Sequence, residues 1–204
     1  MRTETVEYKI FKFDELSPEI QKKVLEKHRY WNVEGFEWWD SVYDMSHEDL
    51  KAKGFMDCKI WFSGFSSQGD GACFDCTNFD GEKLIAALEG RIDDKRFKQY
   101  KRWISKIYQA DLLGFEIRTF NHHYNHKRTR VLEVSFGYGS NKNLKRLDAL
   151  VSSFAEDLEN LRLELCDEIY EMLEKEYEYL TSDEAVKESL EVNEIEFLET
   201  GKRY

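Results

Sequence analysis

The feature that most constrains the fold is an apolar seam in the last third of the chain. Its residues recur three and four positions apart at Leu147, Val151, Phe154, Leu158, Leu161 and Leu165, and the seam then shifts to Ile169, Met172 and Leu173. Such spacing is typical of the buried face of an α-helix. The sequence therefore predicts a helix of roughly 40 residues that starts near Leu144, and its seam either covers a sheet or contacts a second copy of the chain.

Segments in which apolar and polar residues alternate predict β-strands in the rest of the chain. They are residues 5–13, the two runs that flank the loop 66–71, the pair 115–120 and 130–139, and the last segment 194–198. Shorter helices are predicted from Pro18, with Ser17 as the N-cap, and at residues 33–54, 80–90 and 93–114. Because these strands form hairpins instead of alternating with helices, we expect a single α+β domain over residues 1–204. Its mainly antiparallel sheet of about 5–6 strands would pack with several helices, including the long acidic carboxy-terminal one.

The composition indicates a packed protein. Aromatic residues make up 15% of the chain beside 35% charged residues, which favours an aromatic core under a charged surface. No apolar run approaches the length of about 18 residues that a spanning helix needs, and the first residues alternate instead of forming a signal-peptide core. We therefore expect no membrane contact and a cytoplasmic location. The four cysteines, Cys58, Cys73, Cys76 and Cys166, are expected to be reduced packing thiols.

The net charge of −11 is unevenly distributed along the chain. Residues 91–146 carry 14 basic and 5 acidic side chains, whereas residues 147–204 carry 5 basic and 18 acidic ones. The helix predicted after Gly90 carries a basic stripe made of Arg91, Lys95, Lys98, Arg102 and Lys106. This stripe is a solvated face, pairs with the acidic helix, or docks to nucleic acid or an acidic partner, so nucleic-acid binding stays open. The acidic helix is either an ordinary solvated surface or a partner surface that imitates nucleic acid or docks to a basic protein. The carboxylates predicted for that partner surface lie off the apolar seam and are Glu159, Glu164, Glu171 and Glu178.

The stretch WFSGFSSQGDGACF, residues 61–74, places a small polar loop between two apolar runs. The loop is either a glycine-shaped turn or a binding site. As a site, its backbone N–H groups would form a polar pocket for a ligand or partner beside two aromatic rings. The residues of that predicted site are Trp61, Phe65, Ser66, Ser67, Gln68, Gly69, Asp70 and Gly71. It is not a phosphate loop, because the lysine and the following helix are missing.

No complete catalytic or metal-binding set can be recognised in the sequence. Cys73 and Cys76 stand three apart in a predicted strand and therefore face opposite sides. The loop that contains His122, His123 and His126 has no carboxylate nearby in sequence. We expect neither a metal nor a cofactor, and a non-enzymatic role is favoured over a hydrolase that would use Asp70 with a histidine.

Three segments, YKIFKFDELSPEIQKKVLEK, FSGFSSQGDGACF and EFLETGKRY, resemble a family of uncharacterised proteins encoded by phages and bacteria. Its members share a strand, a helix that begins LSPE and a Ser-Gln-Gly-Asp-Gly hairpin, and some are labelled antitoxins of toxin–antitoxin stability systems. The resemblance implies a phage or mobile-element context and supplies no catalytic residues.

These observations together predict a non-enzymatic phage or mobile-element protein that binds and modulates a host factor, in an anti-defence or antitoxin-like role. The expected partner is a host protein, bound in the host cytoplasm by a monomer or a homodimer. The alternative is a small-ligand or nucleotide-binding protein that uses the SSQGDG hairpin.

Overall fold

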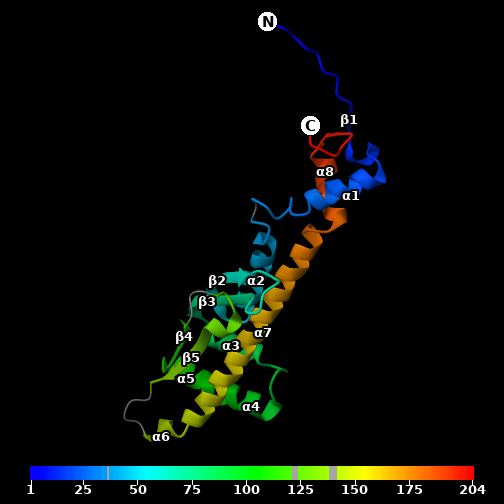
Figure 1. Ribbon diagram of the computed structural model, residues 1–204. Coiled ribbons are helices and arrows are strands. Elements are labelled where there is room, and N and C mark those ends of the chain that lie inside the picture. Colours follow the sequence, from blue (N-terminus) through cyan, green and yellow to red (C-terminus); the bar gives the residue numbers. More distant parts are fainter. Residues whose placement is uncertain (36, 121–123, 138–141) are drawn as a thin grey trace. The chain divides into compact units, whose positions relative to one another are not determined.

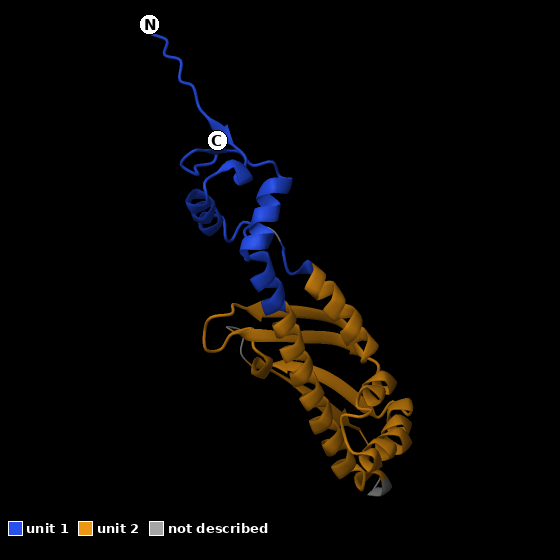
Figure 2. Ribbon diagram, turned by 90° about the vertical axis from the view of Figure 1, so that its right-hand side faces the viewer, with its two compact units in different colours: residues 1–40, 173–204 blue, residues 41–172 orange. Residues whose placement is uncertain are grey.

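A computed structural model describes residues 1–35, 37–120, 124–137 and 142–204, and these residues form an α+β fold (Figure 1). The chain divides into two compact units, shown in different colours in Figure 2. Unit 1 comprises residues 1–40 and 173–204, and unit 2 comprises residues 41–172. Among the helices described here, none combines the length and apolarity needed to cross a membrane.

Unit 1 joins the two ends of the chain around a small core. Its elements are β1 (Ile10–Phe11), the 3-10 helix η1 (Phe13–Glu15), α1 (Pro18–Lys27), the end of α7 (Asp148–Leu180), α8 (Asp183–Val192) and β6 (Phe197–Leu198). Pro18 occupies the first turn of α1, as the sequence predicts, because a proline lacks the N–H that would be unpaired there. The buried core consists of Phe13, Leu16, Val24, Val186, Leu190, Ile195 and Phe197.

Unit 2 consists of two hairpins, several short helices and the first part of α7. Its other elements are α2 (Asp40–Ala52), β2 (Phe55–Ser63), β3 (Gly71–Phe79), α3 (Gly81–Ala87), α4 (Asp94–Gln99), the π-helix η2 (Tyr100–Ile104), α5 (Ser105–Gln109), β4 (Leu113–Thr119), the 3-10 helix η3 (Lys127–Thr129), β5 (Arg130–Phe136) and α6 (Lys142–Lys145). Figure 1 shows α7 running alongside both hairpins. The prediction of a long carboxy-terminal helix is confirmed, although α7 begins at Asp148 and spans 33 residues. Its seam faces the core, where Phe154 and Leu158 are fully buried.

The strands form separate pairs. The prediction of one sheet with about 5–6 strands is wrong: the six strands of the described residues form three two-stranded antiparallel sheets, β1–β6, β2–β3 and β4–β5. The predicted first strand, residues 5–13, is also much shorter, since only Ile10 and Phe11 pair with β6. The alternation of apolar and polar residues predicts which segment can form a strand. It does not predict the partner strand, which here comes from the other end of the chain.

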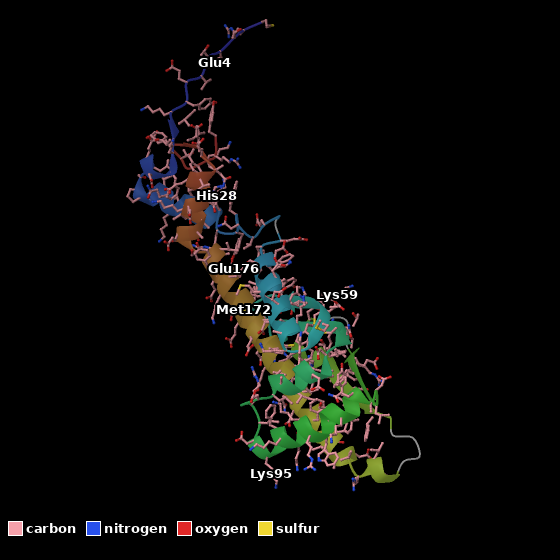
Figure 3. All side chains as sticks on the ribbon, turned by 180° about the vertical axis from the view of Figure 1, so that it is seen from behind. Glu4, His28, Lys59, Lys95, Met172 and Glu176 are labelled. Atoms are coloured by element: carbon pink, nitrogen blue, oxygen red, sulfur yellow. A yellow bond between two sulfur atoms is a disulfide. The ribbon has the colours of Figure 1, made fainter. Side chains whose placement is uncertain are left out.

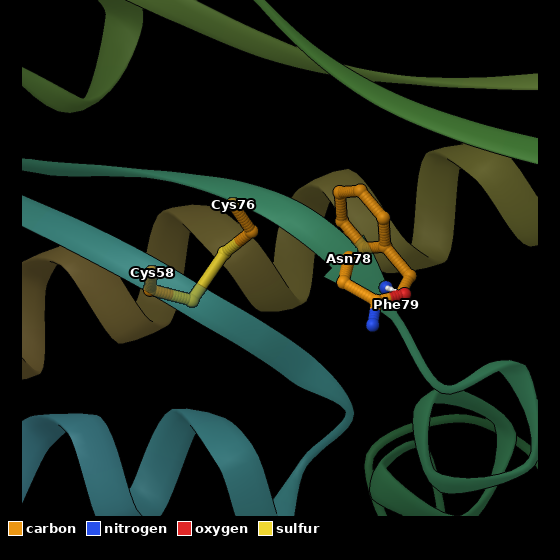
Figure 4. Close-up of a disulfide and its surroundings, with 4 residues drawn as sticks. All are labelled: Cys58, Cys76, Asn78 and Phe79. Carbon is orange, nitrogen blue, oxygen red and sulfur yellow. Dashed lines mark hydrogen bonds between the residues drawn. A yellow bond between two sulfur atoms is a disulfide. The ribbon is translucent and has the colours of Figure 1, made fainter.

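The cysteines divide into a bonded pair and two thiols. Cys58 in β2 lies directly opposite Cys76 in β3, and the two form a disulfide (Figure 4). The prediction of reduced thiols is therefore wrong for this pair, because opposite residues of an antiparallel ladder bring their Cβ atoms close together. The sequence indicates that Cys58 lies across the hairpin, but it does not fix the register that places Cys58 directly opposite Cys76. Cys73 and Cys166 are buried free thiols, as expected.

Candidate functional site

The side chain of Asp70 holds the loop of the β2–β3 hairpin together by hydrogen bonds to the loop backbone. The last strand pair is Ser63 with Gly71, and Asp70 Oδ2 accepts hydrogen bonds from the backbone N–H groups of Ser66 at 2.9 Å and Ser67 at 2.7 Å. Gly69 has a φ of +109°, a conformation that side chains with a Cβ rarely adopt. Asp70 and Gly69 thus fix the turn from within.

The base of this loop is held by other elements of unit 2. Tyr170 on α7 donates its hydroxyl hydrogen to the carbonyl of Gly64 at 3.0 Å, and its ring lies 5.4 Å from that of Phe65. On the other side, Asn125 donates to the carbonyl of Phe62 at 3.3 Å. The hairpin tip is therefore anchored to α7 and to the segment that precedes β5.

The predicted site residues separate into an exposed tip and a packed base. Ser66, Ser67, Gln68 and Gly69 form the exposed tip. Phe65 packs against the rings of Phe62 and Tyr170, and Gly71 lies so close to His126 that a Cβ added to it would sit 2.8 Å from the imidazole. The predicted anion pocket of backbone N–H groups is not favoured by this geometry, because Asp70 already accepts from two of them.

Trp61, the remaining residue of the predicted hairpin site, packs against a largely buried cluster that was not predicted from the sequence. We call it the arginine centre, and its residues are Cys73, Arg130, Glu159, Arg162 and Cys166. Trp61 lies over the guanidinium of Arg130 at 4.4 Å, and Arg130 Nη1 contacts Cys73 Sγ. Arg130 is 7% exposed, and its Nε has no hydrogen-bond partner among the described residues.

Arg162 on α7 is the most constrained residue of the arginine centre. It is fully buried and donates to both carboxylate oxygens of Glu159, with Nε to Oε2 at 2.7 Å and Nη2 to Oε1 at 2.6 Å. Nη2 also donates to the backbone carbonyls of Lys127 at 2.9 Å and Arg130 at 2.8 Å. Arg162 therefore fastens α7 to η3 and β5, beside the segment that supports the hairpin.

Burial keeps the two free thiols protonated. Burial raises the pKa of Cys73 above its ordinary value, although Arg130 acts in the opposite direction. Burial likewise raises the pKa of Cys166 to about 12. Because the thiolate is the nucleophilic form of cysteine, neither residue is suited to nucleophilic catalysis near neutral pH.

We expect Cys166 to make the protein less stable at alkaline pH. The unfolded thiol ionises near 9.0 and the folded one near 12, so the stabilisation is fully present below pH 9 and is lost as pH rises to 12. Between these two pKa values, the Cys166 thiol alone lowers the free energy of unfolding by about 1.4 kcal/mol per pH unit. Urea unfolding of wild type and Cys166→Ala between pH 8 and 11 checks this, and parallel pH curves for the two proteins would contradict it.

The histidine loop gives no metal site in the part that the structure describes. His122 and His123 lie outside the described residues, while His126 Nδ1 accepts from the backbone N–H of Arg128 at 3.2 Å. Burial, together with Lys127 and Arg128, lowers the pKa of His126. Across the described ranges, no group of three or more His, Cys, Asp or Glu residues is placed to hold a metal ion.

The predicted acidic surface is only partly available to a partner. Glu159 does not point outward, since it binds Arg162 and also accepts from the backbone N–H of Leu132 at 2.9 Å. Glu164 forms an ion pair with Arg91. Glu171 and Glu178 are exposed, and Glu178 belongs to unit 1. Neutralising Glu159 would therefore disturb the arginine centre, because its carboxylate accepts hydrogen bonds from Arg162.

The basic middle segment partly neutralises the acidic helix. Besides the Arg91–Glu164 pair, Arg96 Nη1 lies 3.0 Å from Asp157, which also accepts the hydroxyl hydrogen of Tyr100 at 2.6 Å. Lys95 remains exposed (Figure 3). Pairing with the acidic helix, one of the predicted roles of the basic stripe, is therefore observed for Arg91, and the neighbouring Arg96 pairs with the same helix.

Comparison with known proteins places the chain in a family. Neither the curated proteins nor the solved structures include one with significant similarity to it. A domain family, described as a domain of unknown function (DUF8835), matches residues 38–183. This match covers all of unit 2, including the hairpin and the arginine centre. The protein therefore belongs to the DUF8835 family.

Proposed function

We propose that the protein is a non-enzymatic binding protein that docks a host protein with the tip of its β2–β3 hairpin and thereby modulates that host protein. The observation that carries this proposal is the contrast between the exposed tip, Ser66 to Gly69, and its fixed base. Asp70 holds the turn, and Tyr170 holds Gly64. A loop already held in one conformation loses little entropy on binding, which favours recognition.

A macromolecular partner fits this tip better than a small ligand. Small-molecule sites are concave and largely apolar, with a few convergent polar groups. Here the side chains of Ser66, Ser67 and Gln68 are exposed, while the backbone N–H groups of both serines are engaged by Asp70. Small polar side chains on a rigid turn suit adaptable hydrogen bonding to a protein surface.

The context of this binding also remains a proposal. The resemblance in the LSPE helix and the SSQGDG hairpin supports a phage or mobile-element protein that acts on a host factor in the cytoplasm, in an anti-defence or antitoxin-like role. The acidic helix would contribute long-range attraction to a basic partner through exposed carboxylates such as Glu178.

Gln68→Arg is expected to weaken partner binding at least about tenfold, because a long charged side chain at the tip would have to be accommodated in the interface. A photo-crosslinking amino acid at position 68 of the full chain first captures the partner in bacterial cells. Calorimetry with the purified partner then gives the dissociation constants of wild type and variant.

Thr77→Arg is the matched control, since Thr77 is exposed on the same hairpin but lies in β3 away from the tip. It should bind like wild type. Equal affinities for Gln68→Arg and wild type would place the interface elsewhere, as would the absence of any saturable adduct from position 68. A thermal shift with a nucleotide or metabolite, abolished by Gln68→Arg, would favour the small-ligand alternative.

A further inference from the structure

The first nine residues carry an apolar face that nothing in the described structure covers. They have no regular secondary structure, and around Glu4 they extend away from the helices of unit 1 (Figure 3). Val6 and Tyr8 are each 59% exposed and Ile10 is 40% exposed. Tyr204, whose ring lies 6.2 Å from that of Tyr8, is 64% exposed. Because Val6, Tyr8 and Ile10 alternate with Glu7 and Lys9, an extended strand would turn all three to one face, beside Tyr204; we call these four exposed side chains the apolar patch.

The hydrogen-bonding pattern of β1 leaves one edge of this strand open. Leu198 donates its backbone N–H to the carbonyl of Lys202 at 2.8 Å, so it does not donate to Ile10, which lies opposite it. In an antiparallel pair the hydrogen-bonded positions alternate, which assigns the bonded pair to Phe11 and Phe197. The backbone groups of Ile10 therefore point away from β6. By the same alternation, an extended strand would turn those of Tyr8 and Val6 to the open edge as well.

The residues along that open edge are complementary to the same residues of a second chain that runs in the opposite direction. Read in opposite directions, the segment Val6-Glu7-Tyr8-Lys9-Ile10 places Tyr8 opposite Tyr8, Val6 opposite Ile10, and Glu7 opposite Lys9. An interface between identical chains related by a two-fold axis requires this kind of reciprocal match. The alternation above makes Glu7 and Lys9 a non-hydrogen-bonded pair, the type in which opposite side chains approach most closely.

We propose that residues 6–10 pair antiparallel with the same residues of a second copy, with the two-fold axis passing between the two Tyr8 residues. The pairing extends β1, so that one sheet runs from β6 through β1 of one protomer to β1 and β6 of its partner. It also merges the two apolar patches into one. Sheets of three or more strands with an apolar face are far more stable than isolated pairs. The dimer is independent of the hairpin tip and goes beyond the proposed function.

The charge match supplies the first test. We expect the full-length wild type to dimerise with rising concentration in sedimentation velocity. Lys9→Glu places a carboxylate opposite Glu7 twice in each dimer and should raise the dissociation constant about tenfold, which corresponds to about 1.4 kcal/mol. Glu7→Lys should do the same by apposing two ammonium groups. Combining both substitutions restores opposite charges and should return the constant close to the wild-type value.

Lys22→Glu is the matched control, because Lys22 is an exposed residue of α1 and its substitution changes the net charge by the same amount. It should dimerise like wild type. A wild-type protein that stays monomeric to about 1 mM would overturn the proposal. So would a double variant that remains as dissociated as the single ones.

A cysteine at the two-fold axis tests the register. Opposite residues of a hydrogen-bonded pair have Cα atoms about 5.5 Å apart, within the range that a disulfide spans. Tyr8→Cys should therefore form a covalent dimer under mild oxidation. Thr5→Cys should not, because residue 5 lies opposite residue 11 in this register. Equal crosslinking at both positions would indicate random collisions between mobile ends and would overturn the proposed pairing.

Discussion

Arg162→Leu is expected to lower the free energy of unfolding by about 3–5 kcal/mol, because it removes one partner of a buried charge network and leaves the others unpaired. The carboxylate of Glu159 would keep only the backbone N–H of Leu132, and the backbone carbonyls of Lys127 and Arg130 would lose the donor that Arg162 supplies. Urea unfolding, with the midpoint and slope compared between variant and wild type, measures the loss.

Arg91→Leu is the control for this prediction. Arg91 also pairs with a glutamate of α7, Glu164, but both side chains are substantially exposed, so the loss should be no more than about 1 kcal/mol. Replacing both Arg162 and Glu159 by leucine should destabilise less than the sum of the single changes, since neither residue then leaves the charge of the other without its partner. If Arg162→Leu cost no more than Arg91→Leu, the arginine centre would have no structural role.

The arginine centre also connects the core to the candidate site. Arg162 holds the carbonyl of Lys127, and Asn125, two residues earlier, donates to Phe62 at the base of the hairpin. Loosening this segment should therefore reduce partner affinity as well as stability. Gln68→Arg, in contrast, should affect affinity alone, because Gln68 is exposed at the tip.

Local periodicity explains which elements the sequence could predict. The seam through Leu158, Leu161 and Leu165 specifies α7 because a helix forms from neighbours in the chain. The β2–β3 hairpin was predictable for the same reason, with its strands joined by a short glycine-containing loop. The length of β1 could not be predicted in this way. It depends on its pairing with residues 197–198, which lie at the other end of the chain.

The arginine centre shows what periodicity leaves out. Arg162 lies on the seam, four residues after Leu158 and three before Leu165, and Glu159 precedes it by one helical turn. The position of Arg162 on the apolar seam was the one feature of the sequence that indicated its burial. Periodicity nevertheless predicts Glu159 at the surface, because it does not reveal that the backbone carbonyls of Lys127 in η3 and Arg130 in β5 accept hydrogen bonds from Arg162.

Reduction of the Cys58–Cys76 disulfide is expected to lower the free energy of unfolding by about 3 kcal/mol, because the bond restricts the unfolded chain over a sequence separation of 18 residues. Urea unfolding with and without a phosphine reductant measures this difference. The double variant Cys58→Ala/Cys76→Ala is the control, and its stability should not respond to the reductant. Thiol titration in denaturant should give two thiols before reduction, from Cys73 and Cys166, and four afterwards.

Four titratable thiols without any reductant would show that the bond is absent from the protein as purified. If the titration gives two thiols before reduction, the disulfide is present. Its reduction then tests whether the bond affects only stability or also partner binding by the hairpin. The disulfide joins the strands, whereas Asp70 and Tyr170 fix the tip through hydrogen bonds that reduction leaves intact. Partner affinity at low temperature, where both forms are folded, should therefore change less than about threefold on reduction. A larger loss of affinity would mean that the strand pair, and not its turn, sets the conformation of Ser66 to Gly69.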